Sequence, residues 1–371
     1  MHDEIRRTEA ALAEAERRAQ ALDATDRRGE VAALDIQALS LALGAHTALV
    51  EYFALDGELH AFVASDAGIV AVPLAALETD IAAVIEQLRF QIDTLRHGAA
   101  RLQHRMGELR ARALHHLRRL HDALWAPLLP HLGHRRAVVV PHASLHYLPF
   151  EALFDGERHE IERRELARTP SARVLLQCLA RPACTFESAV LLGCADDRLP
   201  HVAREIDAVA ADYPDAIRLT GEAATCATLH GPGAAADVLH IAGHALFRSD
   251  NPRFSALHLA DGAITARDAA RLRLACGLLV LSACETGVAH VLPGNEPIGL
   301  TQSFLSAGAA SVLASLWTVH DEATAGLMAR MHERLRALRQ PSAALREAQL
   351  EMLGTHPHPY YWAAFSLHGR W

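Results

Sequence analysis

The chain has 371 residues, which is enough to bury the core of one large domain or of two modest ones. Hydrophobic residues make up 51% of it and charged residues 22%, a composition typical of globular proteins. The formal net charge of −8 and the aromatic content of 5% both argue against a surface that binds nucleic acid.

The six cysteines, at positions 178, 184, 194, 226, 276 and 284, show no CxxC spacing. This pattern is typical of free thiols in a reducing compartment. The opening residues, Met1–Arg7, lack an apolar signal core, and no apolar run of membrane length follows. We therefore expect a cytoplasmic protein that does not bind a membrane.

Residues 1–33 are rich in Ala, Glu and Arg, and their large apolar side chains are few, notably Ile5, Leu12 and Leu22. This composition predicts a helix, exposed or packed on a partner, followed by a linker. No internal repeat of helix-pair length is visible in this segment.

Strand signals begin at residue 47. Further along, Asp56-Gly57 separates two apolar runs, which predicts a hairpin with a type I′ turn. A further short strand is expected at residues 69–72. Two helical stripes of apolar residues follow, separated by Gly98, and two prolines are expected to close the second helix. The stripes are Ile81, Val84, Ile85, Leu88, Ile92 and Leu95, then Leu102, Met106, Leu109, Leu117, Leu120 and Leu124, and the prolines are Pro127 and Pro130.

From residue 137 onward, strand and helix patterns alternate, which predicts a mostly parallel sheet with helices on both faces. The fold class is thus an α/β sandwich preceded by a β-hairpin and a long-helix subdomain, with residues 34–180 and 181–371 as its two parts. Residues 149–153 are expected to begin a core helix. The expected strands are 137–140, 189–193, 238–243, 278–282, 311–316 and 363–367, and the main expected helices are 203–213, 265–273, 297–307, 322–337 and 342–353.

Two of the predicted strands each end in a reactive residue at a turn of small residues. His244 follows the strand 238–243, and Cys284 follows the strand 278–282. In open parallel α/β sheets, ligands and chemistry collect beyond the carboxyl ends of the strands. If the two strands are neighbours, His244 and Cys284 face each other as a base and a thiol nucleophile. On the residues alone, a small buried side chain stays an equal alternative for Cys284.

His240 and His244 are four residues apart, a spacing that binds zinc when it occurs on a helix. In a strand, the same spacing separates two residues by about 13 Å, which is too far for one ion. We therefore expect no metal and no cofactor, and a packed or supporting role for His240.

Five segments carry a resemblance to a known family, and they occur along the chain in the family's order. They are residues 138–153, with PHASLHYLPFEAL, then 240–245, 281–287, with LSACETG, 299–317 and 358–365. They resemble the CHAT domain, a caspase- and separase-related domain often found after TPR repeats, and the resemblance extends from about residue 35 to residue 371.

This resemblance implies a caspase-like fold and a cysteine endopeptidase with a His244–Cys284 dyad that acts on a protein or peptide substrate. It also implies that the N-terminal helix is what remains of, or substitutes for, an upstream repeat module. Because no TPR repeats are present in this sequence, any regulatory array is either missing or supplied by another chain, a TPR-like protein partner that meets the N-terminal helix.

The tetrahedral intermediates of acyl transfer need backbone N–H donors. The N–H group of Cys284 and one from the segment that contains Gly243 and Ala245 are the candidates. Caspases place a glycine directly after the catalytic histidine, whereas this chain has Ala245, where a positive φ would be strained. We expect Gly243 to supply the flexibility instead.

Ser282 stands where caspases and metacaspases have a residue that helps to read the P1 side chain of the substrate. Acidic residues near the predicted sheet edge favour a basic P1 residue through charge pairing. Each of these acids has the alternative of a solvated loop charge. The expected pocket residues are Ser282, Asp250, Glu285, Glu296 and Asp321.

Two other functions stay open on the sequence. One is a catalytically silent module that keeps the fold and binds partners, and the other is a different thiol enzyme, such as an acyl transferase, on the same scaffold. For a peptidase, we expect the loops at residues 246–256 and 287–297 to gate the site until a ligand or partner opens it.

Overall fold

A computed structural model describes residues 33–96, 101–194, 201–246, 254–283, 299–317 and 321–371. The chain divides into two compact units, residues 1–39 and 40–371. The described part of the first unit contains the beginning of helix α2 (Ile36–Leu43). The Asp35 carboxylate accepts hydrogen bonds from the first free N–H groups of that helix, those of Gln37 and Ala38, at 2.9 and 3.0 Å, and so caps it.

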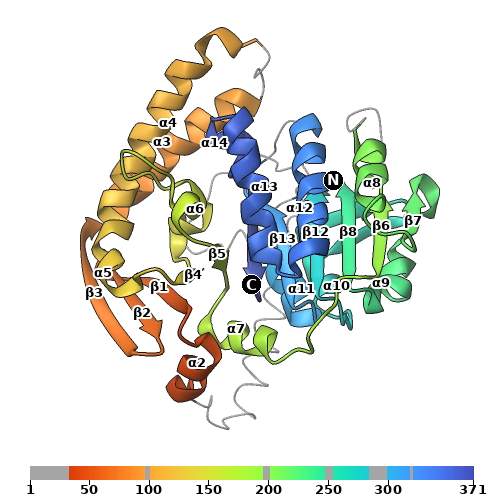
Figure 1. Cartoon of the computed structure of the whole chain (residues 1–371), viewed down its shortest axis with the longest axis horizontal. Coiled ribbons are helices and arrows are strands. Elements are labelled where there is room, and N and C mark those ends of the chain that lie inside the picture. The colour runs from red at the N-terminus through yellow and green to blue at the C-terminus, as the bar shows by residue number, and fades with distance from the viewer. Residues whose placement is uncertain (1–32, 97–100, 195–200, 247–253, 284–298, 318–320) are drawn as a thin grey trace, which may run out of the picture. The chain divides into compact units, whose positions relative to one another are not determined.

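The second unit is built on an 11-stranded sheet with the order β3-β2-β1-β4-β5-β14-β13-β12-β8-β6-β7 (Figure 1). Its strands are β1 (Thr47–Leu55), β2 (Glu58–Ser65), β3 (Gly68–Leu77), β4 (Arg136–Val140), β5 (Leu166–Arg168), β6 (Ala189–Gly193), β7 (Ile217–Thr220), β8 (Val238–Gly243), β12 (Leu278–Ala283), β13 (Ser311–Ser315) and β14 (Phe365–Gly369). A small 3-stranded sheet has the order β11-β10-β9. Its strands are β9 (Ala245–Leu246), β10 (Ala256–Leu259) and β11 (Gly262–Thr265).

The large sheet contains two sets of parallel strands that run in opposite directions. Strands β1, β4, β5 and β14 are parallel to one another, and so are β13, β12, β8, β6 and β7. The sets meet where β14 pairs antiparallel with β13. The carboxyl ends of the two sets therefore lie at opposite edges of the sheet.

Helices cover both faces of the large sheet. The α-helices after α2 are α3 (Glu78–Arg96), α4 (Met106–Leu120), α5 (Leu129–Leu132), α6 (Glu160–Arg163), α7 (Ala172–Leu179), α8 (Val202–Ala210), α9 (Pro232–Ala235), α10 (Ala266–Ala269), α11 (Gly299–Ala307), α12 (Asp321–Leu338), α13 (Pro341–Thr355) and α14 (Pro359–Trp362). Shorter helical turns are η1 (Gln103–Arg105), η2 (His121–Trp125), η3 (Ala126–Leu128), η4 (Ala143–Tyr147), η5 (Phe150–Ala152), η6 (Gly221–Ala223) and η7 (Cys226–Leu229).

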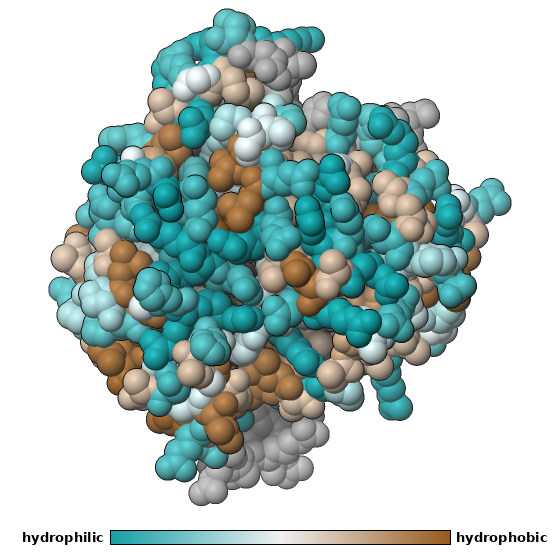
Figure 2. Space-filling model, in the orientation of Figure 1, coloured by the Kyte–Doolittle hydropathy of each residue, from teal (hydrophilic) through white to brown (hydrophobic). Residues whose placement is uncertain are grey.

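Both faces of the central strands are buried. On β8, Val238 and Ala242 join the core beneath α8, α12 and α13, while Leu239 and Ile241 join the core beneath α10 and α11. Burial on both faces explains why these strands read as nearly continuous apolar runs. Figure 2 shows mostly hydrophilic residues on the outer surface of α12 and α13. These two helices are joined by the exposed Arg330–Glu351 ion pair. The predicted α/β sandwich is confirmed.

The predicted hairpin is also confirmed. Asp56 and Gly57 connect β1 to β2, and their φ angles of 52° and 83° are both positive, as a type I′ turn requires. The inner face of the hairpin packs its apolar residues, Val50 and Tyr52 among them, into the core.

The second long helix differs from expectation, because Pro127 and Pro130 do not end it. Helix α4 ends at Leu120, but the helical path continues through the π-helical turn η2 into η3 and α5. Each proline stands in the first turn of one of these later segments. Proline is tolerated there because the N–H group that it lacks has no acceptor in a first helical turn.

Residues 149–153 form only the short turn η5 instead of the expected core helix, and a buried arginine explains why. Arg168 on β5 donates through Nη1 to the carbonyl of His146 (3.2 Å) and through Nη2 to the carbonyl of Leu148 (2.6 Å). Nη2 also lies 3.3 Å from Oε2 of Glu151, and both side chains are about 2% exposed. The guanidinium thus takes the Leu148 carbonyl, which would be the first acceptor of a helix that begins at Pro149.

We expect Arg168→Ala to lower the free energy of unfolding by about 3–5 kcal/mol, because the substitution leaves Glu151 buried without its partner. Urea unfolding followed by circular dichroism measures this change. Arg218→Ala is the matched control, since Arg218 and Asp207 form an exposed pair, and we expect it to cost less than about 1 kcal/mol. An equal loss of unfolding free energy in the two variants would show that the buried pair stabilises the fold no more than the exposed pair does.

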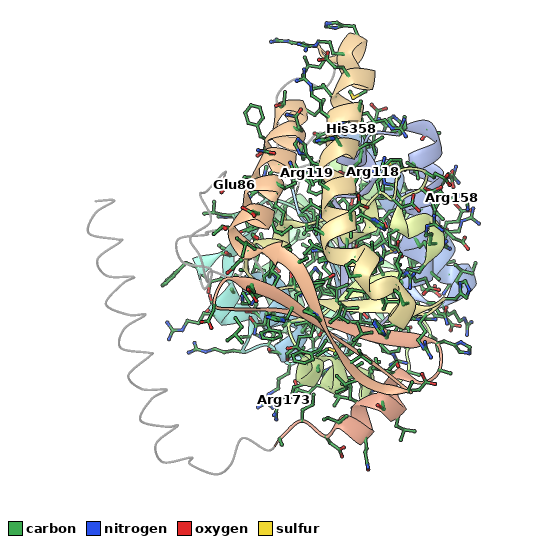
Figure 3. The ribbon with its side chains drawn as sticks, turned by 90° about the vertical axis from the view of Figure 1, so that its left-hand side faces the viewer. Glu86, Arg118, Arg119, Arg158, Arg173 and His358 are labelled. Atoms are coloured by element: carbon green, nitrogen blue, oxygen red, sulfur yellow. The ribbon has the colours of Figure 1, made fainter. Side chains whose placement is uncertain are left out.

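Two histidines are held neutral, the buried His358 and the half-buried His146. Burial lowers the pKa of His358 to about 4, and burial with the nearby charges of Arg168 and His142 lowers the pKa of His146 to about 4. His358 lies beside helix α4 (Figure 3). Its Nδ1 accepts the N–H of Tyr360 at 3.1 Å and so caps α14.

The unfolded chain takes up a proton on this histidine below pH about 6.5, whereas the folded chain does so only near pH 4. Stability is therefore lost as the pH falls through this window, by about 1.4 kcal/mol per pH unit for each such histidine. We expect His358→Asn, which keeps a capping oxygen but does not titrate, to reduce that slope by about this amount. Urea unfolding at several pH values tests it, with the exposed His46→Asn as control; identical slopes in wild type and His358→Asn would contradict it.

Candidate active site

The two strands that carry the predicted dyad are neighbours. Strands β8 and β12 pair in parallel, with Ser282 opposite Ala242 and Ala283 opposite Gly243. His244, the residue after Gly243, is half-buried, and its carbonyl accepts the N–H of His258 at 3.0 Å. The predicted adjacency of the strands is confirmed. Cys284 lies outside the described residues, so its pairing with His244 stays a prediction.

The turn after β8 avoids the strain considered for Ala245. Ala245 lies in β9 and pairs with β10 as an ordinary strand residue. Gly243 takes part in β8 without a positive φ, and the reason for glycine here is close packing. A Cβ at Gly243 would lie 3.1 Å from the Cβ of Cys194, which follows the neighbouring strand β6.

The expected pocket residues are described only in part. Ser282 is 4% exposed within β12, and its hydroxyl has no hydrogen-bond partner among the described residues. Asp321 begins α12, but its side chain is not described. Asp250, Glu285 and Glu296 lie outside the described residues.

The cysteines in the described part of the chain are poor nucleophiles. Burial raises the pKa of Cys276 to about 12 and that of Cys178, Cys184 and Cys226 to about 11. Burial also raises the pKa of Cys194. These five thiols therefore stay protonated near neutral pH, as expected for thiols of the core or the surface.

Four buried polar side chains form a continuous chain of hydrogen bonds beneath the candidate site. His240 Nε2 lies 2.9 Å from Oε1 of Glu205, and His240 Nδ1 lies 3.0 Å from Nε2 of His332. His332 Nδ1 lies 3.1 Å from the hydroxyl of Tyr213. All four residues are at most 1% exposed. We call this set the Glu205–Tyr213 network; it ties α8 and α12 to β8.

One arrangement of protons gives every group in this network a partner. Burial and the neighbouring His240 hold the pKa of His332 well below its usual value, so His332 is neutral and carries one N–H. Tyr213 then donates to His332 Nδ1, His332 donates to His240 Nδ1, and His240 donates to Glu205. The supporting role predicted for His240 thus has a specific form.

Sequence reasoning missed the other members of the network, although a signal was present. A histidine inside an apolar strand such as β8 requires a buried partner. Glu205 interrupts the apolar stripe of Val202, Ile206 and Val209 on α8, and His332 follows Met331 on the buried side of α12. A polar residue within a helical apolar stripe is the pattern that points to such a partner.

A model of one protein family matches most of the chain. It is described as the CHAT domain, and it matches residues 114–370, more than half of the sequence. The chain belongs to the CHAT domain family. The resemblance found in the sequence motifs is thereby confirmed.

The CHAT chain is also similar to other proteins. The mouse (Mus musculus) "Tetratricopeptide repeat protein 28" is 34% identical over 108 residues, which are 29% of this chain and 4% of that protein. Two crystal structures of the Saccharomyces cerevisiae separase–securin complex match at 12% identity with TM-scores of 0.64 and 0.62, covering 90% of this chain and 30% of theirs. At this identity the likeness shows the fold, which is caspase-like. The CHAT chain thus spans less than a third of the length of these relatives.

Among the described residues, no helix combines the length and the apolar character needed to cross a membrane. No group of three or more His, Cys, Asp or Glu side chains among them is arranged to hold a metal ion.

We expect Tyr213→Phe to lower the free energy of unfolding by about 1–3 kcal/mol, because Nδ1 of His332 then stays buried without a donor. Thermal or urea unfolding measures the loss. Tyr361→Phe is the control, since Tyr361 is also buried but its hydroxyl has no hydrogen bond to the described residues. A loss in Tyr213→Phe no larger than in the control would show that the network contributes little to stability.

Proposed function

We propose that this CHAT chain is a cysteine endopeptidase with Cys284 as nucleophile and His244 as general base. The observation that carries the proposal is the register of β8 and β12, in which Ala283 lies opposite Gly243. Cys284 and His244 follow these two residues in the sequence, and parallel sheets place their chemistry beyond the carboxyl ends of their strands. Membership of the CHAT family and the caspase-like fold support the same assignment.

In the proposed reaction, His244 accepts the thiol proton and the Cys284 sulfur attacks the peptide carbonyl carbon. The protonated His244 then gives its proton to the departing amine, which leaves a thioester on Cys284. Water, deprotonated by His244, attacks the thioester carbon and displaces the sulfur. The protonated His244 returns its proton to the sulfur, which restores the thiol, and the acid product leaves as a carboxylate with release of one proton to solvent.

Backbone N–H groups would stabilise the oxyanion that forms in each step. The donors that we propose are those of Cys284 and Ala245. Because the His258 N–H bonds to the His244 carbonyl, and N–H groups alternate in direction along a strand, the Ala245 N–H points away from β10. That direction leaves it available to a ligand at the strand end.

The substrate that we propose is a protein or peptide with a basic P1 residue, read by Ser282 and the acidic residues Asp250, Glu285, Glu296 and Asp321. We further propose that a helical-repeat protein in the cytoplasm regulates the site through residues 1–33. The name of the mouse relative, with its tetratricopeptide repeats, supports a partner of this type.

The test is the rate at which Cys284 is alkylated by iodoacetamide between pH 5 and 9, measured by mass spectrometry in wild type and in His244→Ala. We expect a thiolate that is populated well below pH 8 in wild type and lost in His244→Ala, because the imidazole stabilises it. Cys276, whose pKa is raised to about 12, is an internal control in the same digest. Cleavage of a peptide library should disappear in Cys284→Ala with unchanged circular dichroism.

Two results would contradict the proposal. One is a Cys284→Ala variant that cleaves at the wild-type rate. The other is a Cys284 pH profile that does not change in His244→Ala and follows an ordinary thiol pKa near 8.5, which would favour a binding module.

A further inference from the structure

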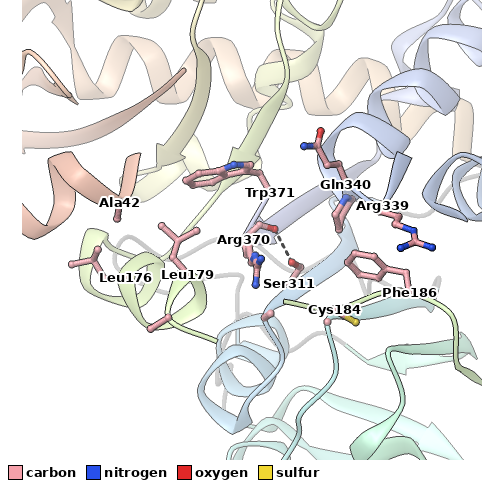
Figure 4. A pocket seen from close by; sticks show the side chains of 14 residues that line it. Ala42, Leu176, Leu179, Cys184, Phe186, Ser311, Arg339, Gln340, Arg370 and Trp371 are labelled. Carbon is pink, nitrogen blue, oxygen red and sulfur yellow. Dashed lines mark hydrogen bonds between the residues drawn. The ribbon is translucent and has the colours of Figure 1, made fainter. Parts of the chain in front are cut away.

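A cavity of about 600 Å³ opens at the sheet edge opposite the candidate active site. Its lining includes Gly277, which precedes β12, Ser311 at the start of β13, and Arg370 and Trp371, which follow β14 (Figure 4). It therefore lies outside the carboxyl end of β14, the kind of position where α/β sheets bind ligands. Its volume is within the range of small-molecule sites, about 300–1,000 Å³.

One residue that lines this cavity has a strained backbone conformation. Among the described residues, four that are not glycine have a positive φ: Asp56, Ala143, Phe186 and Arg339. Phe186 (56°) and Arg339 (54°) both line the cavity. Such conformations cost about 1–3 kcal/mol each and persist at ligand clamps and other functional sites. The type I′ turn explains Asp56. Arg339 directly follows α12, and its N–H bonds to the Leu335 carbonyl at 2.8 Å, as at an ordinary helix C-terminus. Phe186 is thus the strained residue of this cavity.

The polar side of the cavity is cationic. Arg370 is held in place because Nη1 donates to the carbonyls of Arg181 and Pro182, at 3.1 Å each. Its Nε and Nη2 have no hydrogen-bond partner in the described part of the chain. Arg339 adds a second guanidinium, paired at 3.0 Å with Glu187, and none of the described side chains that line the cavity is a carboxylate. A fixed guanidinium with two free donors suits a planar carboxylate or a phosphate.

The other side of the cavity is apolar and includes a flat ring. Leu176 and Leu179 of α7 lie on the same side as Trp371 in Figure 4, while Phe186 lines the opposite side. The guanidinium of Arg136 lies 5.6 Å from the centre of the Trp371 ring and supports it by a cation–π contact. A ligand that reaches Arg370 would thus bring an apolar body against Trp371 and Leu179.

We propose that this cavity binds a small organic anion in which a carboxylate or phosphate is attached to a flat apolar ring. The anionic group meets Arg370, and the ring packs between Trp371 and the leucines of α7. Because the cavity lies at the edge opposite His244, this ligand is not the peptide substrate, and the assignment does not depend on peptidase activity.

Isothermal titration calorimetry with the full chain tests the assignment by means of four probes. Phenyl phosphate and benzoate carry ring and charge, inorganic phosphate carries the charge alone, and benzamide carries the ring alone. We expect saturable 1:1 binding of phenyl phosphate or benzoate, at least tenfold tighter than that of the other two. Which of the two binds more tightly distinguishes a phosphate site from a carboxylate site.

The variants locate the binding. Arg370→Gln should weaken the preferred probe at least tenfold, Arg370→Lys should weaken it less, and Trp371→Leu should weaken the ring-bearing probes but not inorganic phosphate. Arg158→Gln, at an exposed arginine that does not line the cavity, should leave binding unchanged. Circular dichroism and the melting temperature without ligand confirm that each variant is folded. If Arg370→Gln does not fold, the binding measured with Trp371→Leu tests the assignment.

Three results would overturn the assignment. They are the lack of saturable binding for all four probes, binding that is unchanged in both Arg370→Gln and Trp371→Leu, and binding of inorganic phosphate as tight as that of the preferred ring-bearing probe.

Discussion

The antiparallel pairing of β14 with β13 is the constraint on which the rest of this CHAT fold depends. Five residue pairs, from Ser311–Gly369 to Ser315–Phe365, join two sets of parallel strands that run in opposite directions. Two carboxyl edges result, one on each side of the sheet. His244 lies at the first, directly after β8, and the cavity lined by Arg370 and Trp371 lies at the second. A single parallel sheet would place both on one edge, where substrate and small ligand would compete for the same space.

Buried polar groups fix how the helices sit on this sheet. The Arg168–Glu151 pair and the Glu205–Tyr213 network are both almost fully enclosed. Such groups add little net stability over well-packed apolar residues, but they penalise any arrangement that leaves one of them unpaired. A rotation of α8 or α12 about its axis would separate Glu205 or His332 from His240. The network therefore selects one orientation for each helix, while the apolar cores supply most of the burial.

Apolar periodicity predicted the elements whose burial is continuous and could not predict the others. Strands β6, β8 and β12 are buried on both faces and read plainly in the sequence, as do the stripes of α3 and α4. Strand β5 is only 3 residues long and depends on Arg168, and β7 is a mostly exposed edge strand. Neither leaves an apolar run. The Glu205–Tyr213 network was not predicted either, because Tyr213 and His332 are 119 residues apart and no local sequence pattern links them.

The predicted site follows from the register of β8 and β12, and the core itself fixes that register. Side chains alternate between two buried faces, so a slip of one residue would move Val280 from the core beneath α12 to the core beneath α11, and Leu281 the other way. The same slip would change which residue stands beside His240, whose bonds to Glu205 and His332 hold β8 against its helices. Packing in the middle of the sheet thus determines which residues meet at its edge. The proposed pairing of His244 with Cys284 therefore depends on core packing and not on their positions in the sequence alone.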